Sequence, residues 1–188
     1  MKALKTKAMI AMIAAMISVS AMAGTFSQQA GPYASWLNAE DLDNGYGAGL
    51  KYNVMYEGVL PRLGLGLDVR GGWLMFEGDD NDYGTDLDMF PVEATALASY
   101  EVFDGAKPYA GVGIGGYFFD EDDDAVDVDD ELGFYVVLGW DQSIMKHLSV
   151  FAEAKYLWLE PEAKGPAGVE QDLDVGGFGA NVGICMNW

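Results

Sequence analysis

The last stretch of the chain, residues 172–188, alternates apolar side chains with small or polar ones and ends on an aromatic residue. Its apolar positions are Phe178, Ala180, Val182, Ile184, Met186 and Trp188. Side chains of a strand point alternately to the two faces of a sheet, so this pattern predicts a two-faced β-strand. A strand that ends on its apolar face is typical of a sheet closed within lipid, where no edge can stay unpaired. We therefore expect the chain to form a closed transmembrane β-barrel.

The N-terminus has the pattern of a secretory signal peptide. Lys2, Lys5 and Lys7 precede an apolar run over residues 8–19, and Ala21-Met22-Ala23 supplies a small-x-small cleavage site. This run is too short to span a bilayer comfortably, and no later stretch reaches about 18 apolar residues. We expect a signal peptide over residues 1–23 and one exported domain over residues 24–188.

The charge and the cysteine content argue against a nucleic-acid-binding protein and against a disulfide-stabilised fold. The full chain has 10 basic and 30 acidic residues and a net charge of -20. Loss of the three leader lysines makes the exported domain still more acidic, so binding to nucleic acid is not expected. Cys185 is the single cysteine, which precludes an intramolecular disulfide. We interpret Cys185 as a small space-filling residue of the lumen.

Alternating patterns recur along the chain and predict an all-β, eight-stranded antiparallel up-and-down barrel. The expected strands cover about 32–37, 45–56, 62–76, 86–101, 107–119, 132–141, 148–159 and 172–188. In the fourth of these the apolar set changes face at Phe90-Pro91, which predicts a β-bulge. The longer connections, at 38–44, 77–85, 120–131 and 160–171, all lie at one end, as in transmembrane barrels with long outer loops.

Aromatic residues are expected near both ends of the outward face, as two belts at the two membrane interfaces. The predicted periplasmic belt contains Tyr56, Tyr100, Trp140 and Trp188. The predicted outer belt contains Trp36, Trp73, Phe118 and Trp158. A soluble up-and-down barrel such as a lipocalin is the main structural alternative, and it would point the apolar face inward. A thin eight-stranded interior suits the Gly-rich face better than a set of Trp, Tyr and Leu, which favours the membrane barrel.

The Gly-rich face carries six charged residues, three of each sign. They are Lys51, Asp68, Arg70, Glu93, Glu153 and Lys155. A buried charge is tolerated only when it is paired, so we expect these side chains to form a network across the middle of the barrel. Together with Tyr109, Tyr117 and Tyr135, this network is expected to plug the lumen.

Three motifs could carry chemistry, and each has a simpler interpretation. Residues 111–116 resemble a phosphate-binding loop, but they lie in mid-strand with no following helix. The acidic run at 120–131 lacks the spacing of an EF-hand, although bridging of divalent cations to lipopolysaccharide remains a hypothesis. His147 and Ser149 share a strand face, with Glu153 or Glu160 available to orient the imidazole. This pair resembles the lipid A deacylase barrel family, with two departures. Val150, and not Asn, follows Ser149, and the pair lies at the predicted periplasmic end whereas that family acts on lipid of the outer leaflet.

Two segments are similar to the small outer-membrane β-barrel superfamily, which includes the OmpA transmembrane domain and the OmpW and OmpX-like proteins. They are residues 107–119, KPYAGVGIGGYFF, and residues 148–156, LSVFAEAKY. The resemblance covers about residues 31–188 and implies a barrel in the outer membrane. It also implies assembly by the barrel-assembly machinery, for which we assign Ile184, Met186 and Trp188 as the signal.

The sequence thus predicts a non-enzymatic outer-membrane barrel with a structural or surface-interaction role. A conduit for small hydrophobic solutes, like OmpW, is the first alternative, and a lipid A-modifying enzyme is the second. We expect a monomer that contacts outer-membrane lipid and lipopolysaccharide and needs no cofactor.

Overall fold

The computed structural model describes residues 26–40, 44–76, 87–121, 127–128, 130–159, 161–164, 170–172 and 175–188. The expected signal peptide and the predicted loop at 77–85 lie outside these residues, as does most of the acidic run at 120–131. Across the described ranges, no helix is long and apolar enough to cross a bilayer.

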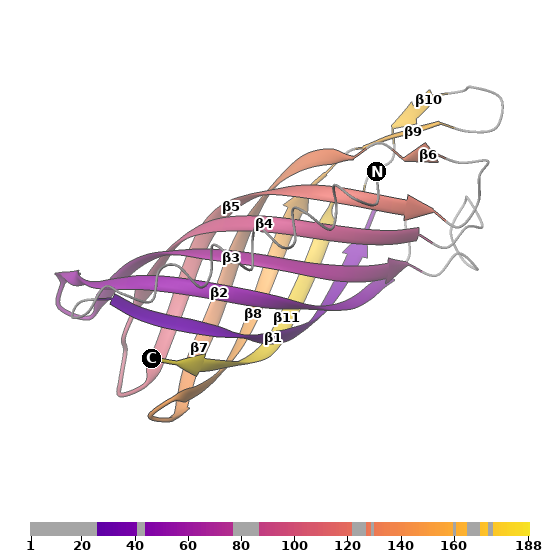
Figure 1. Ribbon diagram of the computed structural model, residues 1–188. Coiled ribbons are helices and arrows are strands. Elements are labelled where there is room, and N and C mark those ends of the chain that lie inside the picture. The colour runs from indigo at the N-terminus through magenta and orange to yellow at the C-terminus, as the bar shows by residue number, and fades with distance from the viewer. Residues whose placement is uncertain are drawn as a thin grey trace.

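Eight antiparallel strands close into a barrel, as predicted (Figure 1). Their order around the wall is β1-β11-β8-β7-β5-β4-β3-β2. Each barrel strand therefore lies beside the barrel strand that follows it along the chain. The barrel strands are β1 (Phe26–Ala39), β2 (Asn44–Leu60), β3 (Leu63–Phe76), β4 (Leu87–Tyr100), β5 (Ala106–Glu121), β7 (Glu131–Met145), β8 (Leu148–Trp158) and β11 (Gly177–Asn187).

The first and last strands close the wall. Their pairing runs from Gln29 opposite Asn187 to Ala39 opposite Gly177. One further pair of backbone hydrogen bonds, 3.2 and 3.1 Å long, joins Gln28 to Trp188. Closure is what removes the unpaired edge that lipid could not satisfy. Pairing also explains why β1 begins at Phe26, earlier than its weak apolar pattern predicts.

Short turns connect the strands at the end where β11 finishes (Figure 1). Leu60 and Leu63 pair around the two-residue turn Pro61-Arg62, in which Arg62 has a positive φ of 69°. Gly105, with a φ of 77°, supplies the left-handed residue of the predicted Asp104-Gly105 turn. The strands β2 and β7 extend to Leu60 and Met145, beyond their predicted ends, and each shifts register close to its turn.

The bulge expected at Phe90-Pro91 is absent, and that prediction was wrong. The pairing of β4 with β5 continues in one register from Leu87 opposite Glu121 to Ser99 opposite Tyr109. Leu87 and Met89 point inward on the same face as Glu93, and all three are buried. The apolar pattern therefore changes face without any backbone shift, because the interior of the barrel is apolar at this end.

A small three-stranded sheet extends beyond the barrel at the opposite end from the short turns (Figure 1). It consists of β6 (Asp127–Val128), β9 (Glu162–Lys164) and β10 (Glu170–Asp172). Two predicted loops, at 120–131 and 160–171, therefore contain strands. Segments this short and polar have no two-faced pattern, so their pairing could not be predicted from periodicity.

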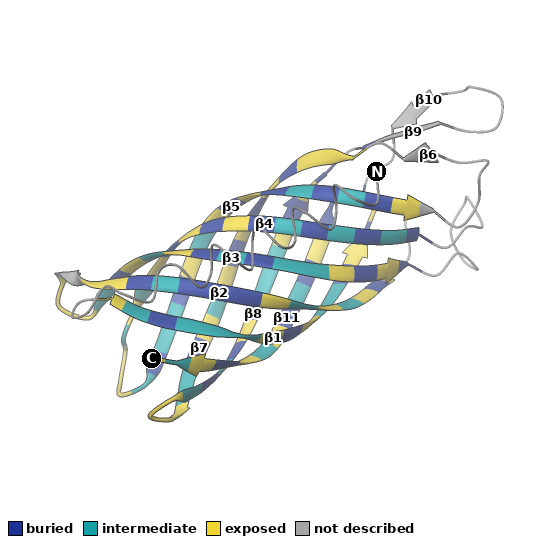
Figure 2. Cartoon of the chain, viewed as in Figure 1, coloured by how far each residue is buried: buried dark blue, intermediate teal, exposed yellow. Residues whose placement is uncertain are grey.

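Burial alternates along the barrel strands, which fixes the direction of each face (Figure 2). On β8, Phe151, Glu153 and Leu157 are buried, whereas Tyr156 and Trp158 are exposed. Large apolar side chains that face outward on other strands are similarly exposed, among them Leu67, Val112, Leu138 and Val182. The outward face is thus a broad apolar belt, and the predicted assignment of the Gly-rich face to the interior is confirmed.

Candidate functional site

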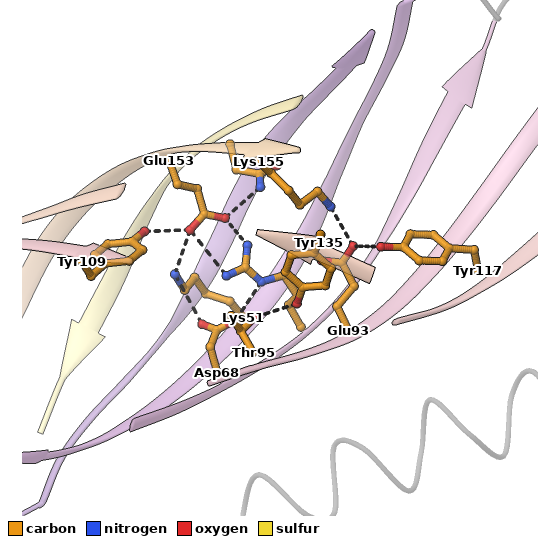
Figure 3. Close-up of polar contacts among 11 residues, drawn as sticks. Lys51, Asp68, Glu93, Thr95, Tyr109, Tyr117, Tyr135, Glu153 and Lys155 are labelled. Atoms are coloured by element: carbon orange, nitrogen blue, oxygen red, sulfur yellow. Dashed lines mark hydrogen bonds and ion pairs between the residues drawn. The ribbon is translucent and has the colours of Figure 1, made fainter. Parts of the chain in front are cut away.

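A buried ion-pair cluster centred on Arg70 crosses the middle of the lumen. Its members Lys51, Asp68 and Glu153 are labelled in Figure 3. The guanidinium of Arg70, a residue only 1% exposed, pairs with Asp68 through Nε at 2.7 Å and with Glu153 through Nη1. Lys51 lies 3.4 Å from Asp68 and 3.7 Å from Glu153. Since β2 and β3 lie across the interior from β8, the contacts of Lys51 and Arg70 with Glu153 join opposite walls of the barrel.

Glu153 collects further donors. Tyr109 donates a hydrogen bond of 2.7 Å to its Oε2, and Asn181 donates one of 2.8 Å to its Oε1. A carboxylate removed from water needs this density of partners, because each unpaired oxygen carries a desolvation cost. The geometry holds the side chain in one position between β3, β5 and β11.

A second ion pair lies next to this cluster. Lys155 Nζ is 2.7 Å from Glu93 Oε1, and the hydroxyl of Tyr117 donates to the same oxygen at 2.7 Å (Figure 3). Tyr135 and Thr95 share a hydrogen bond of 2.6 Å. The structure therefore brings together all six charged residues that the sequence placed on the inner face, in two groups of equal positive and negative charge.

The inward tyrosines lie over glycines of the neighbouring strand. A Cβ added to Gly139 would collide with the ring of Tyr109, and one added to Gly113 would collide with the ring of Tyr135. Glycine at these positions is what lets a large ring lie flat across the narrow interior and reach a polar partner. The high glycine content of the strands is thus a packing requirement.

An apolar layer fills the lumen at the end opposite the short turns. It contains Leu37, Leu74, Phe76, Leu87, Met89, Phe119, Leu157, Leu159 and Val175, with Tyr117 and Tyr135 beneath it. This layer was not predicted from the sequence, because apolar residues of the strands were expected to face outward. The signal was present at Leu87 and Met89, which share the strand face of Glu93.

His147 and Ser149 are not brought together. The hydroxyl of Ser149 is buried and donates to Asp141 at 3.0 Å and to the side chain of Asn187 at 3.2 Å. Nδ1 of His147 lies 3.1 Å from the carbonyl oxygen of Asn187, at an exposed turn. Glu153 bonds to Arg70 instead of orienting the imidazole. The arrangement thus lacks the hydrogen bond through which a histidine activates a serine.

The residues predicted as an assembly signal lie on the outward face of β11 and just after it. Trp188 is 53% exposed, and Ile184 and Met186 are exposed as well. Trp188 packs near Tyr52, with ring centroids 6.4 Å apart.

Cys185 faces inward and is buried in a small cluster with Tyr33 and Phe151. Among the described residues, no group of three or more His, Cys, Asp and Glu side chains could hold a metal ion.

Solved structures share this architecture. Over 88% of this chain and 96% of its own, the outer membrane protein OprG from Pseudomonas aeruginosa is 16% identical, with a TM-score of 0.63. AlkL, solved in lipid bilayers, is 17% identical over 90% of this chain and 92% of its own, with a TM-score of 0.55. Ail, the attachment invasion locus protein of Yersinia pestis, is 15% identical over 89% and 100%, with a TM-score of 0.55.

These likenesses concern the fold. Among curated proteins, no match was found. The sequence pattern of the outer membrane protein beta-barrel domain matches residues 9–184, which is most of the chain. The protein therefore belongs to the outer membrane protein beta-barrel domain family and is located in the outer membrane.

Proposed function

We propose that this protein is a closed, non-enzymatic barrel with a structural or surface-interaction role in the outer membrane. The observation that supports this most strongly is the filling of its interior. Arg70, Lys51 and Glu153 bridge opposite walls, and Glu93 and Lys155 add a second crossing. The apolar cluster around Phe76 and Leu157 lies above them.

A filled interior disfavours passage of ions or polar solutes. An ion entering the middle layer would have to displace side chains that are paired with one another. An ion entering the apolar layer would have to lose its hydration shell with no polar replacement. The proposed role is therefore carried by the outward belt, which contacts lipid, and by the segments beyond the barrel at the far end. Contact with lipopolysaccharide and a monomeric state are parts of the same proposal.

Conductance measurements test the proposal. The purified barrel should give no steady ion conductance in planar bilayers. A variant with both crossings weakened, Arg70→Ala with Lys155→Ala, serves as a control for a loosened plug. Stable channels from the wild type would overturn the proposed role.

Lipid A mass spectra from cells with and without the protein should be identical, and a new lipid A species would indicate an enzyme.

A conduit for small hydrophobic solutes is the second candidate, and one observation favours it. The outer wall has a hollow of about 880 Å³ whose lining includes Trp36, Phe178 and Trp140 together with several alanines. A hydrophobic solute could occupy this hollow on its way to the bilayer. If the candidate is correct, liposomes containing the barrel should take up a hydrophobic tracer faster than empty liposomes, and Ala154→Trp should slow the uptake. Equal uptake by both liposomes would exclude it.

A further inference from the structure

The hollow in the outer wall is part of a longer groove that follows β11 and β8. A second hollow, of about 350 Å³, adjoins the one of about 880 Å³, and Ala34 and Val182 line both. The second hollow extends to Val150 and Ile184, which are opposite each other in the pairing of β8 with β11. Together the two hollows follow β11 from Phe178 to Ile184.

Alanines form the floor of this groove, and larger side chains form its sides. Ala180 is directly opposite Ala154, and this pair lies between Trp36 on β1 and Leu138 on β7. All four residues line the larger hollow. The polar residues of the lining belong to the inward face of the same strands, as with Glu153, whose buried carboxylate is paired in the lumen. The side chains that the groove presents to the membrane are therefore apolar.

The groove has the length of one lipid leaflet. Six residue steps separate Phe178 from Ile184 on β11, which is roughly 20 Å of extended strand. Strands of transmembrane barrels tilt by about 35–45°, so this length covers roughly 15 Å of membrane depth. Half of a hydrocarbon core of about 30 Å is the same depth. One acyl chain that crosses a single leaflet therefore fits along the groove.

The position of the groove selects the outer leaflet. Its Phe178 end lies opposite the short turns, beside Trp36 of the predicted outer belt, and the centroids of the two rings are 6.4 Å apart. Just beyond these rings, the exposed side chain of Asn44 accepts hydrogen bonds from Trp36 and Asn38. Amide groups can donate to and accept from the hydroxyl groups of a sugar. The lipid of the outer leaflet is lipopolysaccharide, whose lipid A carries its acyl chains on a sugar headgroup.

We propose that this groove holds one acyl chain of lipid A, with the sugar headgroup beside Asn38 and Asn44. The site rests on the proposed function, in which the barrel contacts lipopolysaccharide, and it names the surface that makes this contact. A chain in the groove has protein atoms on three sides, so it gains more dispersion contacts than a chain on a flat part of the apolar belt. It should therefore exchange more slowly than the other lipids around the barrel.

Native mass spectrometry of the barrel released from nanodiscs tests the groove. The nanodiscs contain a phospholipid with saturated chains and a smaller amount of purified lipid A. The wild type should retain one lipid A molecule after the other lipids have dissociated. Ala180→Leu, which fills the middle of the groove, should abolish this retention. Ala96→Leu is the matched control and should retain lipid A, because Ala96 is an exposed alanine of β4 that lies between Leu67 and Val112, away from the groove.

A second readout uses the wild type alone and does not depend on the folding of a variant. In bicelles of deuterated phospholipid, nuclear Overhauser effects should connect the lipid A chains to the methyl groups of Ala154 and Ala180. The absence of these effects would overturn the inference.

The outcomes separate this site from the proposed function. Retention of lipid A by Ala180→Leu, or equal retention of the phospholipid by the wild type, would overturn the groove and leave the contact with lipopolysaccharide intact. A wild type that retains no lipid A would contradict both. Uptake of a hydrophobic tracer that Ala180→Leu abolishes, with no lipid A retained by the wild type, would assign the groove to solute passage instead.

Discussion

Glu153 has four polar partners in the described lumen. Arg70 and Lys51 pair with it, and Tyr109 and Asn181 donate hydrogen bonds to it. Lys155 is two residues away on the same strand face, yet it pairs with Glu93 on β4. Glu153 and Glu93 are thus each matched to a cation from a non-adjacent strand, which links walls that backbone pairing alone does not join.

The pair between Lys155 and Glu93 can be separated from the rest of the network by a double-mutant cycle. Lys155→Met leaves Glu93 buried without a cation, so we expect a loss of about 3 kcal/mol in the free energy of unfolding. Glu93→Gln together with Lys155→Met should lose less, because the glutamine is neutral and can still accept from Tyr117. Urea unfolding in lipid vesicles, followed by tryptophan fluorescence, measures both. Equal losses in the single and the double variant would contradict a buried pair.

Glycine packing under the tyrosines gives a second prediction. Gly139→Ala should displace the ring of Tyr109 from Glu153 and destabilise the barrel by about 1–3 kcal/mol, as overpacking does. Gly116→Ala is the control, since its new Cβ would lie no closer than 3.5 Å to any neighbour. Thermal unfolding midpoints compare the two variants. A midpoint for Gly139→Ala equal to that of the control would show that the ring is loosely held.

Two turns at the same end each contain a residue in the left-handed backbone conformation, which is an arginine in one turn and a glycine in the other. Arg62 adopts a positive φ in which a side chain is strained, whereas Gly105 does so without cost. Arg62→Gly should therefore leave stability unchanged or raise it by up to about 1 kcal/mol, and Gly105→Ala should lower it by at least as much. The unfolding midpoint should fall in Gly105→Ala and should not fall in Arg62→Gly. A loss in Arg62→Gly would mean that its side chain contributes more than its backbone costs.

The strands and their faces could be predicted from the sequence because the outward face alternates over long stretches. The pattern at Phe90-Pro91 misled the prediction, since apolar Leu87 and Met89 are inward where the lumen itself is apolar. Partners in the lumen could not be predicted either. Periodicity places Glu93 and Lys155 on the inner face, but only the closed barrel shows that they meet.

The closing strand gives a prediction about assembly. Trp188 forms backbone hydrogen bonds with Gln28 and adds an aromatic ring to the outward belt. Deleting Trp188 should reduce the amount of folded barrel in the outer membrane and leave aggregated protein in the periplasm, while Trp188→Phe should assemble normally. Heat-dependent migration in detergent gels, after membrane fractionation, reports the folded fraction. Normal levels of the truncated chain would contradict a role for Trp188 in assembly.

The molecule as a whole is a wall with an apolar outside and a layered inside. From the short turns upward, the lumen passes from a polar mouth at Asp141 through the ion pairs of Arg70 to the apolar cluster around Phe76. Exposed aromatic residues lie towards both ends of the outward face, as with Trp140 in the last part of β7 and Trp158 at the end of β8. This combination suits a barrel whose surface meets lipid and whose interior excludes water.

A scan of side-chain environments along β8 tests this account most directly. Single nitroxide labels at positions 150–158, in a Cys185→Ala background and in lipid vesicles, are probed with oxygen and with a water-soluble nickel chelate. Outward positions such as Ala152 and Tyr156 should be accessible to oxygen in the bilayer. Inward positions such as Phe151 and Leu157 should be inaccessible to both reagents. Access of the nickel chelate to the inward positions, or failure of oxygen to distinguish the two sets, would contradict a filled barrel in a membrane.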